Sequence, residues 1–149
     1  MLARAYILAV AVALTIAPCD AATRDGSTID TAIPLKQRGA KAVEEEMQWM
    51  MKLHGYTPVL ATRDAALDIA RQLKAGKKRE TVKSQSPWSH RTLKHGEQWC
   101  SYWGFLTPRG RKEIYFDTGV SINTPGEVER QESTRSKYIE KMWQSFNSR

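Results

Sequence analysis

The segment from Trp99 to Asp117 constrains the fold of this chain most strongly, because it has the pattern of a β-hairpin. Residues 99–106 and 111–117 are rich in aromatic side chains, and Thr107-Pro108-Arg109-Gly110 places Pro and Gly where a type I turn prefers them. If Leu106 pairs with Arg111, Trp103 lies opposite Ile114 and Ser101 opposite Phe116. We expect the core on the aromatic face that results, which carries Trp99, Trp103, Phe105, Ile114 and Phe116.

The opposite face of the hairpin is too apolar for full exposure and too charged for full burial. It carries Cys100, Tyr102, Gly104, Leu106, Arg111, Glu113, Tyr115 and Asp117. We therefore expect a third strand or a partner to cover it. Residues 81–85 and 120–122 are the two candidate strands.

Two helical patterns precede the hairpin. The first begins with Pro34 in its first turn and ends at Gly55, with apolar residues at helical spacing and glutamates on the other face. The second is capped by Thr62 and ended by Gly76, with the apolar stripe Ala66, Ile69, Ala70 and Leu73.

A third helical pattern follows the hairpin. Thr124-Pro125-Gly126-Glu127 is a capping box with Pro at the first helical position. We expect the stripe near its end to dock on the aromatic face, so that Trp103 and Trp143 share one core; the stripe is Tyr138, Ile139, Met142, Trp143 and Phe146. The predicted fold class is α+β: two N-terminal helices, a small antiparallel sheet built on a hairpin at about 99–117, and a C-terminal helix. We expect residues 34–149 to form a single small globular domain.

The N-terminus predicts export. Arg4 precedes a charge-free apolar run of about 13 residues, roughly 20 Å as a helix, which is short for a membrane span and typical of a signal peptide. We expect residues 1–21 to be cleaved, residues 22–33 to be a flexible leader, and the mature protein to be periplasmic or secreted without a transmembrane segment. The alternative is a lipoprotein acylated on Cys19, although Pro18 stands where a lipobox has a small residue.

Loss of Cys19 would leave Cys100 as the only cysteine of the mature chain. No internal disulfide could then form. Because Trp99, Tyr102 and Trp103 surround it in sequence, we expect Cys100 to be buried, with a dimer linked through Cys100 as the alternative.

The net charge of +7 is concentrated in the middle of the chain. Residues 77–112 contain nine basic residues against Glu80 and Glu97, interleaved with aromatic residues. This pattern favours an anionic polymer or a protein as partner, because cations neutralise charge and aromatic rings stack. The candidate binding residues are Lys83, Arg91, Lys94, Arg109, Arg111, Lys112, Tyr102 and Tyr115.

Catalytic signatures are absent, and the sequence implies no cofactor. Cysteine catalysis is disfavoured because all three histidines precede Cys100. His90 and His95 with Lys94 between them have the side chains that a metal-independent nuclease needs, although a loop would have to bring the two rings together. His90, His95 and Glu97 match no known metal-site spacing.

Two functional hypotheses therefore remain. The first is a small exported basic protein without enzymatic activity that docks an anionic or protein partner in the envelope or outside the cell, as an accessory subunit or an inhibitor of the immunity type. The second is a small secreted nuclease or toxin that uses His90 and His95.

Overall fold

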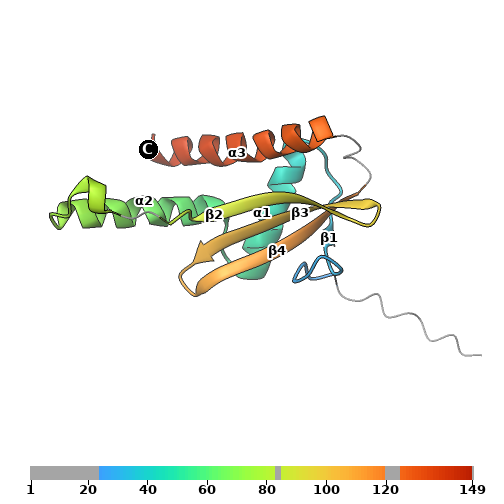
Figure 1. Ribbon diagram of the computed structural model, residues 1–149, viewed down its shortest axis with the longest axis horizontal. Coiled ribbons are helices and arrows are strands. Elements are labelled where there is room, and N and C mark those ends of the chain that lie inside the picture. Colours follow the sequence, from blue (N-terminus) through green and yellow to red (C-terminus); the bar gives the residue numbers. More distant parts are fainter. Residues whose placement is uncertain (1–23, 83–84, 120–124, 149) are drawn as a thin grey trace, which may run out of the picture.

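A computed structural model of the 149-residue chain describes residues 24–82, 85–119 and 125–148. Figure 1 shows its elements, which confirm the α+β class with two helices before the sheet and one after it. In chain order they are β1 (Ile33–Pro34), α1 (Ala40–His54), α2 (Pro58–Lys74), the short 3-10 helix η1 (Arg79–Thr81), β2 (Trp88–His95), β3 (Gln98–Thr107), β4 (Gly110–Gly119) and α3 (Pro125–Asn147).

The described strands form one sheet in the order β1-β4-β3-β2. The predicted hairpin register is confirmed, since Leu106 pairs with Arg111, Trp103 with Ile114 and Ser101 with Phe116. A register shift between Trp99 and Cys100 ends the regular pairing of β3 with β4. The sheet is antiparallel except at β1, which pairs with β4 in parallel over two residues.

The third long strand is β2, which was not one of the two predicted candidates and which extends the sheet beside β3. Residues 79–81 form η1, while Lys83, Ser84 and residues 120–122 lie outside the described residues. The segment around His90, for which we expected a loop, is β2 and pairs with β3 along its whole length. Gly96, at φ +60°, opens a two-residue turn of the primed type that favours a tight hairpin.

The first helix begins later than predicted, because Pro34 belongs to β1. The Glu45 side chain accepts hydrogen bonds from the backbone N–H groups of Lys36 and Gln37, both at 2.9 Å, and so holds an extended approach to α1. The end of α1 at Gly55 is as predicted, with this glycine in the left-handed conformation.

The second helix begins earlier than predicted. Thr57, not Thr62, caps α2, because the Thr57 hydroxyl accepts from the N–H of Leu60 at 3.4 Å and Pro58 occupies the first turn. The Thr62 hydroxyl instead donates to the Pro58 carbonyl inside the helix, at 2.9 Å. Pro58, directly after the capping Thr57, therefore determines where α2 begins.

The flexible leader expected over residues 22–33 is also corrected from Arg24 onward. The Tyr115 N–H donates to the Gly26 carbonyl at 2.8 Å, and Ile33 is buried. Gly26 has φ +72°, and a Cβ there would lie 2.8 Å from Cγ1 of Ile114. This close approach docks the segment along the edge of β4.

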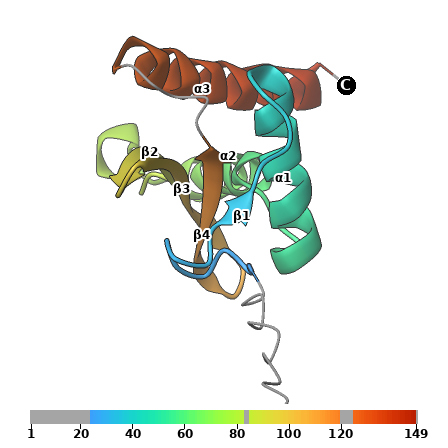
Figure 2. The same ribbon diagram turned by 90° about the vertical axis from the view of Figure 1, so that its right-hand side faces the viewer.

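The core lies on the predicted aromatic face, where Trp103, Phe105, Ile114 and Phe116 are buried with residues of α1 and Ile139 of α3. Trp99, which was predicted to belong to the same face, is only partly buried and lies outside the core cluster, at the register shift of β3. In Figure 2, α1 lies beside β4 and α3 runs across the top of the molecule. Trp143 is outside this core cluster, and Phe146 is exposed, so the prediction that Trp103 and Trp143 share one core is wrong. The stripe of α3 does dock on the aromatic face, because Ile139 belongs to the core cluster and Tyr138 and Met142 pack against it. Only the last members of the predicted stripe, Trp143 and Phe146, lie outside the cluster.

Among the described helices, none combines the length and the apolar character needed to cross a membrane.

Candidate binding surface

The described helices pack against one face of the sheet and leave the other, here called the outer face, without a helix. At one end of the outer face Cys100 and Asp117 are buried, whereas Arg91, Arg111 and Glu113 are exposed. Alternate residues of β2, β3 and β4 point to this outer face. Six of them line a pocket of about 280 Å³: Ser89, Arg91, Leu93, Tyr102, Arg111 and Tyr115. The structure thus brings together four of the eight predicted binding residues, which are Arg91, Tyr102, Arg111 and Tyr115.

Arg111 crosses the sheet within this pocket. It starts on β4, and its Nη2 donates to the Ser89 hydroxyl of β2 at 2.7 Å. Its path passes over Gly104 of β3, where a Cβ would lie 2.5 Å from Nη2 of Arg111 and 2.9 Å from the Tyr102 hydroxyl. The missing side chain of Gly104 therefore makes room for the crossing.

Two tyrosines form an aromatic wall beside the arginine. The rings of Tyr102 and Tyr115 have centroids 5.1 Å apart at an interplanar angle of 49°. The Tyr102 hydroxyl donates to Oε1 of Glu113 at 2.7 Å. Burial, followed by this hydrogen bond, raises the pKa of Tyr102, so the phenol stays neutral at physiological pH.

The two arginines of the outer face, Arg91 and Arg111, form no direct ion pair within the described residues. The Glu113 carboxylate lies on the same face and accepts from Tyr102. Arg91 is exposed, while Arg111 is held by Ser89. The pocket therefore offers one positioned and one exposed guanidinium next to aromatic rings, which suits the binding of an anionic group and its neighbouring ring or chain.

The other predicted binding residues lie elsewhere. Arg109 and Lys112 line a separate cavity of about 490 Å³ near the hairpin turn, with His54 and Tyr56. Burial, and then the charge of Lys112, lowers the pKa of His54. Lys94 stands over the ring of Trp99 at 5.9 Å, and Lys83 lies outside the described residues.

The two histidines of the nuclease hypothesis are held apart. His90 points to the inner face, where its Nε2 lies 3.0 Å from the Ser101 hydroxyl and its ring 4.7 Å from that of Trp103. Burial, and then the charge of Arg135, lowers the pKa of His90 to about 2, so this ring is neutral at physiological pH. His95 lies five residues further along β2, on the opposite side, and pairs with Asp30 at 3.0 Å.

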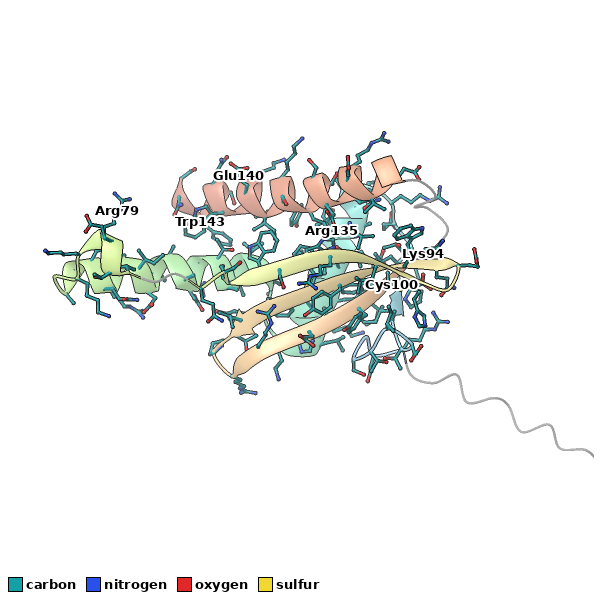
Figure 3. The ribbon with its side chains drawn as sticks, in the orientation of Figure 1. Arg79, Lys94, Cys100, Arg135, Glu140 and Trp143 are labelled. Atoms are coloured by element: carbon teal, nitrogen blue, oxygen red, sulfur yellow. The ribbon has the colours of Figure 1, made fainter. Side chains whose placement is uncertain are left out.

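A buried polar network lies beneath the inner face, and the sequence did not reveal it. Arg135 of α3 binds Glu46 of α1 through two hydrogen bonds, at 2.6 and 3.0 Å, and Glu46 also accepts from the Trp103 indole at 3.0 Å. Figure 3 shows Arg135 pointing from α3 into the protein. Glu46 and Arg135 are 0% and 1% exposed, so the network joins three elements and offers no surface to a ligand.

Cys100 is buried, as predicted, with 2% of its surface exposed. Burial, and then the Asp117 carboxylate, raises the pKa of the thiol. A disulfide-linked dimer through Cys100 is therefore disfavoured, because the thiol is both inaccessible and protonated.

The described residues contain no cluster of three or more His, Cys, Asp or Glu side chains suited to a metal ion. Comparison of the chain with protein families, with curated proteins and with solved structures finds no match.

Proposed function

We propose that this protein is a small exported binding protein without enzymatic activity, which docks an anionic partner through the outer face of its sheet. The observation that carries the proposal is the pocket in which Arg91, Arg111, Tyr102 and Tyr115 meet on the outer face. The net charge of +7 supports the same class of partner.

The positions of the two arginines favour a shared anionic group. The hydrogen bond to Ser89 brings the Arg111 guanidinium to β2, two residues from Arg91 on the same face. Residues two apart on a strand are separated by about 7 Å, so one carboxylate, phosphate or sulfate can contact both guanidinium groups. A partner that repeats such groups, as an anionic polymer or an acidic protein surface does, fits this spacing.

The nuclease or toxin hypothesis has no comparable support. Its two imidazoles lie on opposite sides of β2, and His90 is neutral with its Nε2 next to Ser101. A general acid and a general base must both reach the same phosphate.

Export is part of the proposal, and its supporting pattern lies in residues 1–21, outside the described residues. We expect the exported protein to begin at Ala22. Mass spectrometry of the protein purified from the periplasm or medium tests this, and retention in the cytoplasm with an intact Met1 would contradict it. A mass increase corresponding to a diacylglycerol on Cys19 would replace cleavage at Ala21 by the lipoprotein alternative.

The binding site is tested with a matched pair of double variants. Arg91→Gln/Arg111→Gln removes two charges from the outer face, and Arg109→Gln/Lys112→Gln removes two charges near the hairpin turn. Binding to RNA, single-stranded DNA, peptidoglycan, lipopolysaccharide and an acidic polypeptide is titrated at two salt concentrations, with product formation followed in parallel. Hydrogen bonds to charged groups contribute about 1.5 kcal/mol or more each, so the outer-face variant should bind its partner about 100-fold more weakly.

The control variant should bind within about three-fold of the wild type. Gly104→Ala provides a further check, because it displaces Arg111 and Tyr102 without changing the charge, and it should also weaken binding. Equal losses in both double variants would mean that net charge, not the pocket, drives binding. Conversion of a substrate that stops with His90→Ala or His95→Ala would replace the proposal by the enzyme hypothesis.

A further inference from the structure

The second half of α2 projects away from the rest of the protein. In Figure 1, α2 and η1 extend beyond both the sheet and the C-terminal end of α3. After Ala61 no residue of α2 is buried, and from Leu67 to Thr81 every residue except Ile69 and Gln72 is exposed. We call residues 67–81 the basic arm.

The basic arm carries a concentrated charge. Residues 67–81 contain five basic residues, Arg71, Lys74, Lys77, Lys78 and Arg79, against Asp68 and Glu80. Within the described residues none of the five forms an ion pair, although Lys77 donates to the Gln72 side chain at 3.1 Å. Complementarity to the helix dipole accounts for Arg71 and Lys74 in the last turn but acts little beyond it.

Apolar side chains accompany these cations. Leu67 and Leu73 are 47% and 38% exposed, although neither is needed by the core. Leu67, Arg71 and Lys74 follow one another at spacings of four and three residues, so they share one side of the helix. Asp68 and Gln72, which hydrogen-bond to each other at 2.7 Å, lie on a different side.

We propose that the basic arm docks on the surface of an anionic lipid bilayer. An interfacial helix places cations among the headgroups and inserts a neighbouring apolar side chain at the edge of the acyl chains. On the arm, Leu67 shares one side of the helix with Arg71 and Lys74, whereas Leu73 lies about 120° away around the helix. A nucleic acid fits less well, because residues 61–86 contain no aromatic side chain on which bases could stack. This surface is separate from the outer-face pocket, so the inference stands independently of the proposed function.

Binding to a bilayer would also stabilise the helix of the basic arm in the absence of a protein partner. A helix of this length has little stability by itself in water, and repulsion among its cations weakens it further. Contact with anionic headgroups would neutralise the cations. Leu67 would leave water at the same time.

The inference is tested by sedimentation with lipid vesicles. The protein is purified after export, and its N-terminus is checked by mass spectrometry so that the apolar residues of the predicted signal do not contribute. Vesicles of phosphatidylcholine alone are compared with vesicles that also contain phosphatidylglycerol. We expect binding only to the anionic vesicles, and weaker binding as salt is added.

Matched variants locate the contact. Lys74→Gln/Lys77→Gln/Lys78→Gln removes three charges from the arm, whereas Lys36→Gln/Lys137→Gln/Lys141→Gln removes three exposed charges elsewhere. The arm variant should bind anionic vesicles about 100-fold more weakly, because each lysine near such a surface contributes about five-fold. The control variant should stay within about three-fold.

Leu67→Ser tests the apolar part of the contact. Since Leu67 is exposed, the variant should unfold like the wild type yet bind vesicles about ten-fold more weakly, as loss of an inserted leucine predicts. Arg91→Gln/Arg111→Gln should bind vesicles normally. Vesicle binding that is unchanged in the arm variant, or a preference for RNA over vesicles that Leu67→Ser does not alter, would overturn the inference.

Discussion

Replacement of Arg135 by methionine removes one half of an ion pair that has no access to solvent. Glu46 would keep a hydrogen bond from Trp103 but lose both hydrogen bonds from the guanidinium, and its carboxylate is fully buried. Removal of one partner of a buried pair costs about 3–5 kcal/mol, because the remaining charge is uncompensated. This loss is a large part of the total stability of an ordinary domain, which is about 5–15 kcal/mol.

The double variant Glu46→Met/Arg135→Met should be less destabilised than the sum of its two single variants. It removes both charges together, which is often close to neutral when the volume is kept. The Trp103 indole N–H would then lack its acceptor, at a cost of about 1–3 kcal/mol. We therefore expect a loss of about 1–3 kcal/mol for the double variant, against about 6–10 kcal/mol for the sum.

Urea unfolding followed by tryptophan fluorescence measures all of these free energies. Arg63→Met is the matched control, because Arg63 also pairs with a carboxylate, that of Asp64 at 3.0 Å, but is 43% exposed. Such a surface pair contributes about 0–1 kcal/mol. A loss below 1 kcal/mol for Arg135→Met, or additive losses in the double variant, would refute the reasoning.

Two further predictions concern the core and the histidine of β2. Trp103→Ala should cost about 3–5 kcal/mol, whereas Trp143→Ala should cost clearly less because Trp143 lies outside the core cluster; equal losses in thermal unfolding would contradict this. The pKa of His90 is about 2 in the folded protein, against an ordinary value near 6.5 in the unfolded chain. Between these two pH values only the unfolded chain binds the proton, so the free energy of unfolding falls as the pH is lowered from about 6.5 toward 2. The slope should be about 1.4 kcal/mol per pH unit below the ordinary pKa, and His90→Gln should lose it between pH 6 and 4; an identical pH dependence of both proteins would show that His90 does not cause it.

The sequence by itself determined the features that depend on neighbouring residues. Alternation along β3 and β4 and the Pro108-Arg109-Gly110 turn specified the register of the hairpin and its buried face, because a slip by one residue would expose the aromatic side chains. The start of α3 at Pro125 was also predicted from the sequence, because its capping pattern involves only neighbouring residues. The places of Tyr102, Arg111 and Tyr115 on the outer face also followed from the alternation along β3 and β4. Their meeting with Ser89, Arg91 and Leu93 did not, because β2 was not predicted.

Only the tertiary structure decided the features that depend on distant partners. The polar sequence around His90 predicts an exposed side chain. Pairing of β2 with β3 and the contact with Trp103 instead make His90 an inward-facing, neutral side chain. Arg135 lies in a polar stretch of α3 and reads as exposed, but Glu46, 89 residues earlier, receives it in the core. The physical reason is that a charged side chain can be buried only where a partner replaces its water, and no local pattern shows where that partner lies.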